Sequence, residues 1–165
     1  MMEVFGIPII TTSKFKKSGK LNHVASIMAE LLDQDSDGCV DDPNVLRNIL
    51  IKSIPDGSKS KTKAAPTMVL PNKDVTDAEM AVMKEKGFLY PGTHVGLNEA
   101  KPKCSGLNFT KTCSDSSIEE QFHFITSFGH SNAYAKIFGT SWKTPSNMTK
   151  AMDIARYVFG FNFPY

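Results

Sequence analysis

The spacing of apolar residues predicts helices over much of the chain. The clearest pattern begins at Lys20, where apolar side chains recur at the three- and four-residue intervals of one helical face. These side chains are Leu21, Val24, Ala25, Met28, Leu31 and Leu32. The same spacing, with the capping and stop residues that accompany it, predicts further helices at residues 77–86, 117–128 and 148–158, and one from residue 43 to a stop near residues 55–57.

β-branched residues predict two short strands, at residues 4–12 and 67–70. Polar residues 14–19 predict a turn, and Gly129 predicts a break before a short helical stretch at 134–138. The aromatic tail, residues 159–165, is expected to pack on the core. A length of 165 residues is enough to bury one core. The expected fold is therefore mainly α with a few short strands, an α+β single domain spanning 1–165.

An acidic loop between two predicted helices carries the most specific chemistry. Asp33, Asp35 and Asp37 occupy alternate positions, and Gly38 follows where a sharp turn needs positive φ. Calcium is a hard cation that binds six to eight oxygens, and loops supply them from carboxylates at this spacing. The backbone carbonyl of Cys39 is expected to be a further ligand. The sequence thus predicts an EF-hand-like calcium loop at 33–44.

The end of this loop departs from the EF-hand pattern. Position 12, where that motif has a bidentate Glu, is Asn44. Asp41 or Asp42 is expected to supply the last carboxylate instead, while Asp42 and Pro43 begin the next helix as N-cap and first residue. The loop resembles the shorter calcium loops of the dockerin type more closely than a complete EF-hand. The alternative is a solvated acidic turn that binds no ion.

A second group of residues on the helix at 117–128 suggests zinc. Glu119 and His123 lie four residues apart on one face, and Glu120 lies between them. This order resembles the His-Glu-x-x-His helix of zincins, with Glu119 in place of the first histidine. His130 or His23 would complete the zinc ligands, and Glu120 would be the catalytic general base that activates water.

A purely structural explanation of the same residues remains open. Ser116 with Glu119, or Ser117 with Glu120, has the spacing of a capping box. Two acidic residues in a first helical turn also suit the helix dipole. His123 would then be a hydrogen-bonded histidine beside the core.

Composition excludes some classes of function. The net charge is +2, and the lysine clusters contain no aromatic residues that would stack on bases, so no nucleic-acid partner is expected. No apolar run is long enough to cross a bilayer. The first ten residues lack the basic and apolar regions of a signal peptide. Cys104 and Cys113 flank a short polar segment that a disulfide would close, which leaves Cys39 unpaired.

Several segments together resemble a family of secreted proteins of unassigned activity. They are the run from His23 through Asp33 to Pro43, the Glu119-Glu120-x-x-His123 helix with Gly129, Tyr134 and Phe138-Gly139, and the run Ala151-Met152-Asp153-Ile154-Ala155-Arg156. The resemblance implies a calcium loop, a zincin-like helix and an extracellular location, and no established reaction.

The sequence therefore favours a secreted calcium-binding domain with a structural or binding role. Its partner would be a protein or peptide that the sequence does not identify, and the oligomeric state is equally open. The alternative is a zinc-dependent, peptidase-like hydrolase that uses the degenerate Glu-Glu-x-x-His motif. Ca²⁺ is the cofactor of the first hypothesis, and Zn²⁺ is the cofactor of the second.

Overall fold

The structure, a computed structural model, describes residues 1–51, 65–66, 68–90, 93–105, 110, 113–139 and 145–159. Its strands are β1 (Met2–Val4), β2 (Ile7–Thr11), β3 (Ala65–Pro66), β4 (Met68–Leu70) and β5 (Phe88–Leu89). Its helices are α1 (Ser13–Lys17), α2 (Lys20–Leu32), α3 (Pro43–Ile51), α4 (Asp77–Glu85), the 3-10 turn η1 (Pro102–Cys104), α5 (Ser116–Ile125), the π-helix η3 (Thr126–His130), α6 (Ser131–Ala133), α7 (Ala135–Phe138) and α8 (Asn147–Phe159).

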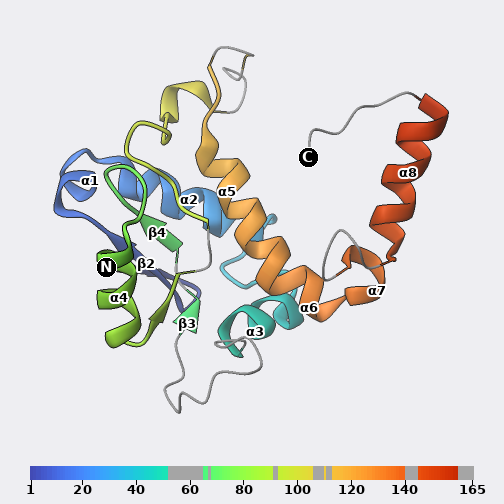
Figure 1. The fold of residues 1–165 in the computed structure, drawn as a ribbon, viewed down its shortest axis with the longest axis horizontal. Coiled ribbons are helices and arrows are strands. Elements are labelled where there is room, and N and C mark those ends of the chain that lie inside the picture. Colours follow the sequence, from blue (N-terminus) through green and yellow to red (C-terminus); the bar gives the residue numbers. More distant parts are fainter. Residues whose placement is uncertain are drawn as a thin grey trace.

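Short strands form a small mixed sheet in the order β1-β2-β4 (Figure 1). β1 and β2 are antiparallel, and β2 and β4 are parallel, with Ile9 opposite Met68. On the other side of β4, the Val95 N–H donates to the Val69 carbonyl oxygen (3.1 Å) and extends the pairing by one bridge. A second pair, β3 with β5, is also parallel. Pro8 lies within β2 opposite Glu3, and Pro71 directly follows the end of β4.

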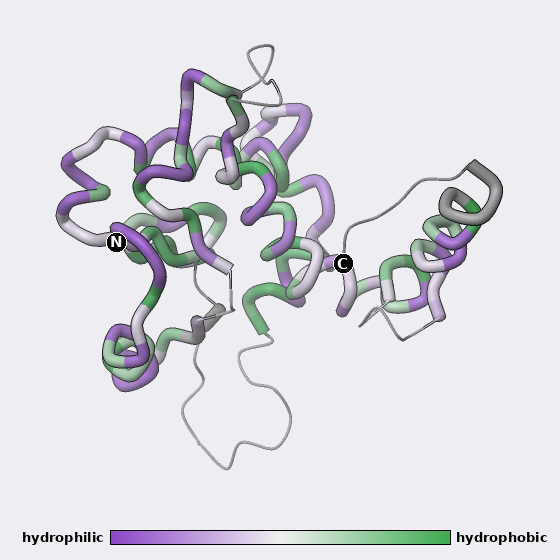
Figure 2. The backbone as a smooth tube through the Cα atoms, turned by 45° about the horizontal axis from the view of Figure 1, so that its top comes forward, coloured by the Kyte–Doolittle hydropathy of each residue, from purple (hydrophilic) through white to green (hydrophobic). Residues whose placement is uncertain are grey.

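One hydrophobic core lies between the sheet, α2, α3 and α5. Its largest side chains with no exposed surface include Phe15 from α1, Met28 from α2, and Phe124 from α5. Burying such a side chain stabilises a fold by about 1.5–3 kcal/mol. The helices alternate between hydrophobic and hydrophilic residues along their length (Figure 2), as amphipathic helices do when one face is buried.

The π-helix η3 continues α5 and packs against α3. The glycine at its centre, Gly129, allows this close approach. A Cβ atom at residue 129 would lie 2.6 Å from Cγ1 of Val45 and 3.2 Å from Cδ1 of Ile49. The absence of a side chain at Gly129 therefore sets the distance between α3 and the helical segment after α5. α8 lies on the far side of α5 from the sheet and packs against α7 (Figure 1).

Most of the predicted architecture is confirmed, and three local predictions of secondary structure are wrong. The fold is mainly helical with short strands, and α2, α4 and α8 begin within one residue of their predicted starts. The single strand predicted at residues 4–12 is instead the antiparallel pair β1 and β2, because Phe5 and Gly6 adopt positive φ and turn the chain between them. The predicted turn at 14–19 is instead the short helix α1, because the Thr12 hydroxyl caps it at the Phe15 N–H (3.3 Å). Gly129 does not break the helix, since the chain stays helical through η3.

Some predictions concern residues outside the described ranges. These are the end of the helix that begins at Pro43, the loop after it, and the packing of the aromatic tail from residue 160 onward. Among the helices that the structure describes, none has the length and apolar character required to cross a membrane.

Candidate metal centre

The acidic loop joins the end of α2 to the start of α3. The Asp33 N–H donates to the Ala29 carbonyl oxygen (2.9 Å), so the loop begins directly at the last turn of α2. The Asp41 N–H donates to the Leu32 carbonyl oxygen (2.9 Å) and closes the loop at its base. Both flanking helices contribute to the hydrophobic core, which fixes the two ends of the loop in space.

Three carboxylates of this loop face one another. Asp33, Asp35 and Asp37 each place an oxygen within 4.8 Å of the other two. Calcium–oxygen bonds of about 2.3–2.6 Å allow one ion to span oxygens separated by up to about 5 Å. Asp33 is buried at 8% exposure, whereas Asp35 and Asp37 are exposed. One ion would therefore have a rigid anchor at Asp33 and an open side at Asp35 and Asp37.

The backbone turns around the Asp33 carboxylate. Its Oδ1 accepts from the Asp37 N–H (3.2 Å), and its Oδ2 accepts from the Gly38 N–H (3.0 Å). Positive φ values at Ser36 (58°) and Gly38 (87°) make this turn possible. The prediction of positive φ at Gly38 is confirmed, while the strained Ser36 was not predicted.

Cys39 and Asp41 form the return side of the loop. The Cys39 N–H donates to Oδ1 of Asp37 (2.7 Å), and its thiol is exposed and unbonded. Oδ2 of Asp41 accepts from the Gln34 N–H (2.8 Å) across the loop. The side chain of Cys39 therefore plays no part in closing the loop, and its carbonyl remains the predicted ligand.

Asp42 is engaged outside the loop. Its Oδ1 accepts from the N–H groups of Asn44 (2.9 Å) and Val45 (3.2 Å), which confirms the predicted N-cap of α3. Its Oδ2 accepts from the Tyr134 hydroxyl (2.7 Å). Burial alone would raise the pKa of Asp42, but these hydrogen bonds and the nearby His130 ring lower it. Among the described residues, neither Asp41 nor Asp42 belongs to the group of converging carboxylates. Asp42 contacts the start of α3 and Tyr134, so Asp41, within the loop, remains the predicted fourth ligand.

The donor set of the loop fits calcium. All its side-chain donors are carboxylate oxygens, which hard cations prefer over nitrogen and sulfur. Asn44 lies in the first turn of α3, and its carbonyl oxygen accepts from the Asn48 side-chain amide (2.9 Å), so the twelfth position is helix rather than loop. The loop is thus shorter than an EF-hand loop.

The Glu-Glu-x-x-His helix is α5, and its acidic residues differ in environment. Glu119 and His123 are exposed, whereas Glu120 is half-buried. Burial raises the pKa of Glu120, with a further contribution from Glu119, although His123 and His94 oppose it. His94 is itself held by the Tyr90 hydroxyl, 2.9 Å from its Nδ1. No local sequence pattern connects His94 with α5.

The remaining candidate zinc ligands lie in other places. Nε2 of His23 is 2.5 Å from Oδ2 of Asp115, and the His130 ring stacks on Phe138 with centroids 4.7 Å apart. Among the described residues, the aspartates at 33, 35 and 37 are the one group whose ligand atoms converge closely enough for a single metal ion. The structure therefore does not gather Glu119, His123, His130 and His23 into one ligand set.

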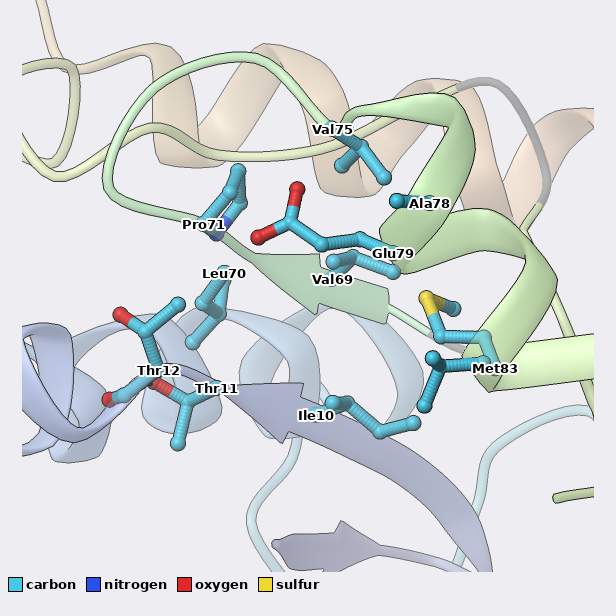
Figure 3. A pocket seen from close by; sticks show the side chains of 11 residues that line it. Ile10, Thr11, Thr12, Val69, Leu70, Pro71, Val75, Ala78, Glu79 and Met83 are labelled. Atoms are coloured by element: carbon cyan, nitrogen blue, oxygen red, sulfur yellow. Dashed lines mark hydrogen bonds between the residues drawn. The ribbon is translucent and has the colours of Figure 1, made fainter.

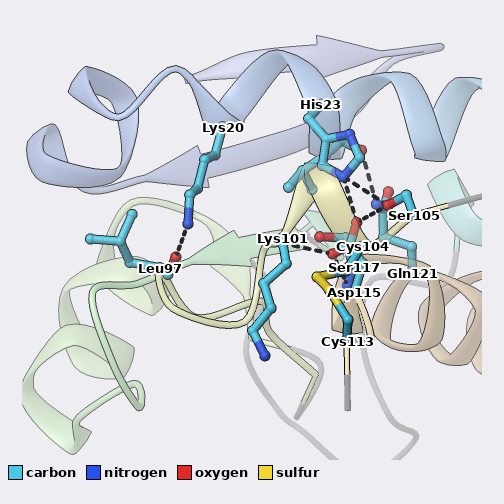
Figure 4. Close-up of polar contacts among 11 residues, drawn as sticks. Lys20, His23, Leu97, Lys101, Cys104, Ser105, Cys113, Asp115, Ser117 and Gln121 are labelled. Carbon is cyan, nitrogen blue, oxygen red and sulfur yellow. Dashed lines mark hydrogen bonds and ion pairs between the residues drawn. A yellow bond between two sulfur atoms is a disulfide. The ribbon is translucent and has the colours of Figure 1, made fainter. Parts of the chain in front are cut away.

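Asp115 is the best-buried acid outside the loop, with no exposed side-chain surface. It is the N-cap of α5, since its Oδ1 accepts from the Ser117 N–H (3.1 Å). Figure 4 shows that Ser105 and His23 both contact its Oδ2, while the Lys101 N–H donates to Oδ1 (3.1 Å).

The cap at Asp115 has two consequences. The predicted capping boxes at Ser116 and Ser117 are wrong, because α5 is capped one residue earlier. Burial alone would raise the pKa of Asp115, but its contacts with Ser105, His23, Ser117 and the Lys101 amide hold it far below its usual range. Asp115 thereby ties α2 and α5 to the loop closed by the Cys104–Cys113 disulfide, a pairing that the sequence had left open.

An apolar hollow of about 320 Å³ lies between β2, β4 and α4 (Figure 3). Glu79 is the acidic residue in its lining, and its Oε2 accepts from both the N–H and the hydroxyl of Thr76 (2.9 Å each). That carboxylate completes the capping box of α4. Glu79 therefore acts as a helix cap, and its carboxylate is not a free charge for a ligand in the hollow.

Comparison of the chain with protein-family models, with curated protein sequences and with solved structures gives no match. The resemblance to secreted proteins stays a prediction.

Proposed function

We propose that this chain is a secreted, calcium-stabilised domain with a structural or binding role. The observation that carries the proposal is the convergence of the Asp33, Asp35 and Asp37 carboxylates within 4.8 Å. Two such charges repel by ~1 kcal/mol even at the dielectric constant of water, and by more where Asp33 is buried. A divalent ion among them turns this cost into a favourable interaction, which explains why folding tolerates the cluster.

A structural role fits the position of the loop better than a sensor role. Both ends of the loop belong to core helices, so bound calcium would stabilise the α2–α3 connection. Three aspartates supply the converging side-chain carboxylates. We propose Asp41, which accepts from the Gln34 N–H across the loop, as the source of a fourth. Without the bidentate Glu of an EF-hand, the expected affinity is that of extracellular modules, with a Kd of about 10⁻⁴–10⁻³ M. The Cys104–Cys113 disulfide supports an oxidising, extracellular location.

Isothermal titration calorimetry of chelator-stripped protein tests calcium binding directly. We expect saturable uptake of one ion below about 1 mM, in the range of extracellular sites. Asp35→Asn should abolish this heat, and Asp153→Asn, at an exposed aspartate on α8, should leave it unchanged. Equal heats for wild type and Asp35→Asn would place the ion elsewhere and end the proposal.

A zinc-dependent, peptidase-like hydrolase is the second candidate, and the environment of Glu120 is the observation that favours it. A half-buried glutamate with a raised pKa near two histidines, His94 and His123, suits general acid–base chemistry. As they lie, these side chains do not converge on a single point. Zinc would have to draw them together, and it would then polarise a substrate carbonyl or a water molecule.

Metal analysis and one substitution separate the two candidates. Protein purified without chelator should contain stoichiometric zinc if the hydrolase proposal is right, and no stoichiometric zinc if it is wrong. Glu120→Gln should then abolish peptidase activity without changing the melting temperature. Glu85→Gln, at an exposed glutamate on α4 with no role in the proposed zinc site, is the matched control for the loss of charge.

A further inference from the structure

The apolar hollow between β2, β4 and α4 has the size of a small-molecule site. Its volume of about 320 Å³ lies at the lower end of the range of ligand pockets, roughly 300–1,000 Å³. An apolar cavity of about 150 Å³ holds one benzene ring, so a space twice as large holds a molecule of about ten to twelve carbon atoms. Figure 3 shows its two walls, with Ile10 and Val69 on the sheet and Ala78 and Met83 on α4.

The polar side chains in the lining already have hydrogen-bond partners in the protein. They belong to Thr11, Thr12 and Glu79. The Thr11 hydroxyl donates to the Thr12 carbonyl oxygen (3.2 Å), and the Thr12 hydroxyl donates to Oδ1 of Asn72 (2.8 Å). Oε2 of Glu79 accepts from the two donors of Thr76. A strongly polar ligand would therefore lose its hydrogen bonds to water here and gain few replacements.

The main chain that borders the hollow is occupied by the sheet. Ile10 pairs with Val69 in the parallel ladder of β2 and β4, and the next residue of each strand continues the ladder. On the other edge of β4, the Val69 carbonyl oxygen accepts from the Val95 N–H (3.1 Å). β2 itself lies between β1 and β4. Within the described residues, an extended peptide therefore finds no open strand edge at the hollow, and apolar contact is what remains for recognition.

The α4 wall of the hollow favours an uncharged occupant. Val82 is 50% exposed and Ala78 is also exposed, although both line the hollow, so an apolar molecule would gain free energy by covering them. The exposed Glu79 lines the same space. Hydrogen bonds from the backbone N–H and the hydroxyl of Thr76 lower the pKa of Glu79, which is therefore negatively charged at neutral pH. This charge disfavours an anion beside it.

We propose that this hollow binds an uncharged, hydrocarbon-rich small molecule of about ten to twelve carbon atoms. The molecule would fill the space between α4 and the sheet and so join the two. None of the described lining residues belongs to the acidic loop or to α5. The binding therefore goes beyond the proposed function and does not depend on calcium or zinc.

A methyl NMR titration with 1-decanol tests the site directly. This probe has a ten-carbon chain and one uncharged hydroxyl group. We expect saturable shifts of the methyl signals of Ile10, Val69, Ala78 and Val82, which line the hollow. Ile154, which is 56% exposed on α8, is the reference for nonspecific contact with apolar surface, and its signals should stay in place.

Two related probes test the size and the charge of the ligand. Burying one further methylene tightens binding about fourfold, so 1-octanol should bind about fifteenfold more weakly than 1-decanol. Decanoate has the same chain length as 1-decanol and a negative charge. At pH 7 it should bind about tenfold more weakly or worse, because the desolvation of its carboxylate and the charge of Glu79 both oppose binding.

A pair of substitutions on α4 tests the location. Ala78→Phe places a ring in the hollow and should abolish the saturable shifts. Ala81→Phe is the matched control, because Ala81 is exposed on the same helix and is not one of the described lining residues. This variant should bind 1-decanol as the wild type does. The wild-type titrations decide the question even if Ala78→Phe fails to fold.

Three results would overturn the proposal. Shifts at Ile154 as large as those at Val82, or the absence of saturable shifts at Val82, would show that the hollow is not a binding site. Decanoate binding as tightly as 1-decanol would refute an uncharged ligand. Unchanged 1-decanol binding by folded Ala78→Phe would place the ligand elsewhere.

Discussion

Replacing Asp35 by Asn isolates the contribution of an ion from that of the fold. Asp35 is exposed, and its Oδ1 accepts from the Asp37 N–H (3.2 Å), a bond that an asparagine oxygen can also accept. The substitution therefore removes a charge and little else. Asp33 would be a poorer choice, because it is buried and accepts two backbone amides that the loop needs in any state.

The size of the effect follows from mass action. At a free calcium concentration ten times Kd, binding to the folded state alone stabilises it by ~1.4 kcal/mol. For a chain of 165 residues, each kcal/mol shifts the melting temperature by about 2–4 °C. Wild type should therefore melt ~3–6 °C higher in calcium than in EDTA, by the same conversion. Asp35→Asn should lose most of this difference.

The sign of the effect in EDTA provides a stricter test. Without calcium, Asp35 repels Asp33 and Asp37, so the variant should be as stable as wild type or more stable, by up to ~1 kcal/mol. In differential scanning calorimetry, wild type should therefore have the higher melting temperature in calcium. In EDTA, the melting temperature of Asp35→Asn should equal or exceed that of wild type. Asp153→Asn should follow wild type in both buffers. A wild-type melting temperature that is identical in calcium and EDTA would refute the reasoning.

Three further predictions concern residues that hold the helices and loops of the core together. Asp115→Asn should lower the free energy of unfolding by about 2–4 kcal/mol at pH 6, because the amide replaces one of the two accepting oxygens by an NH₂ group. Either the His23 and Ser105 side chains or the Lys101 and Ser117 N–H groups then lose their acceptor. Since folding lowers the pKa of Asp115, its stabilisation is complete above the ordinary value of ~3.9 and is lost as pH falls below it. The difference between the two urea midpoints should therefore shrink at pH 3, and a constant difference would contradict this assignment. Gly129→Ala should cost about 1–3 kcal/mol in urea denaturation, since the new Cβ would meet Val45 at 2.6 Å, whereas an unchanged midpoint would show that α3 moves freely. Replacing Cys104 and Cys113 together by Ala should cost about 3 kcal/mol, from the entropy of the loop that the disulfide closes, as measured by the same urea midpoints.

Local signals made α2, α3 and the loop predictable. Asp42 and Pro43 mark a helix start through their own chemistry, and the apolar spacing from Leu21 marks a buried face. Aspartates at alternate positions before Gly38 likewise predict a loop from the local sequence alone. The structure shows these features where the sequence placed them.

Contacts between distant segments could not be predicted in the same way. The role of Tyr134 depends on meeting Asp42, and the continuation of the helix through Gly129 depends on packing against α3. A glycine usually weakens a helix, but here tertiary packing overrides that propensity. The sequence did contain one local indication of the role of Asp115. An aspartate that precedes a helix starting with serines is itself a good N-cap.

The parallel pairing of β2 with β4 has a consequence for the kinetics of folding. Ile9 reaches its neighbour Met68 only after the chain has passed through α1, α2, the acidic loop and α3. Closing such a long connection is slow, since its entropy is lost before the strands gain their hydrogen bonds. An ion that joins α2 to α3 early would shorten this search. Calcium present during refolding should therefore accelerate sheet formation, beyond any effect on the finished protein.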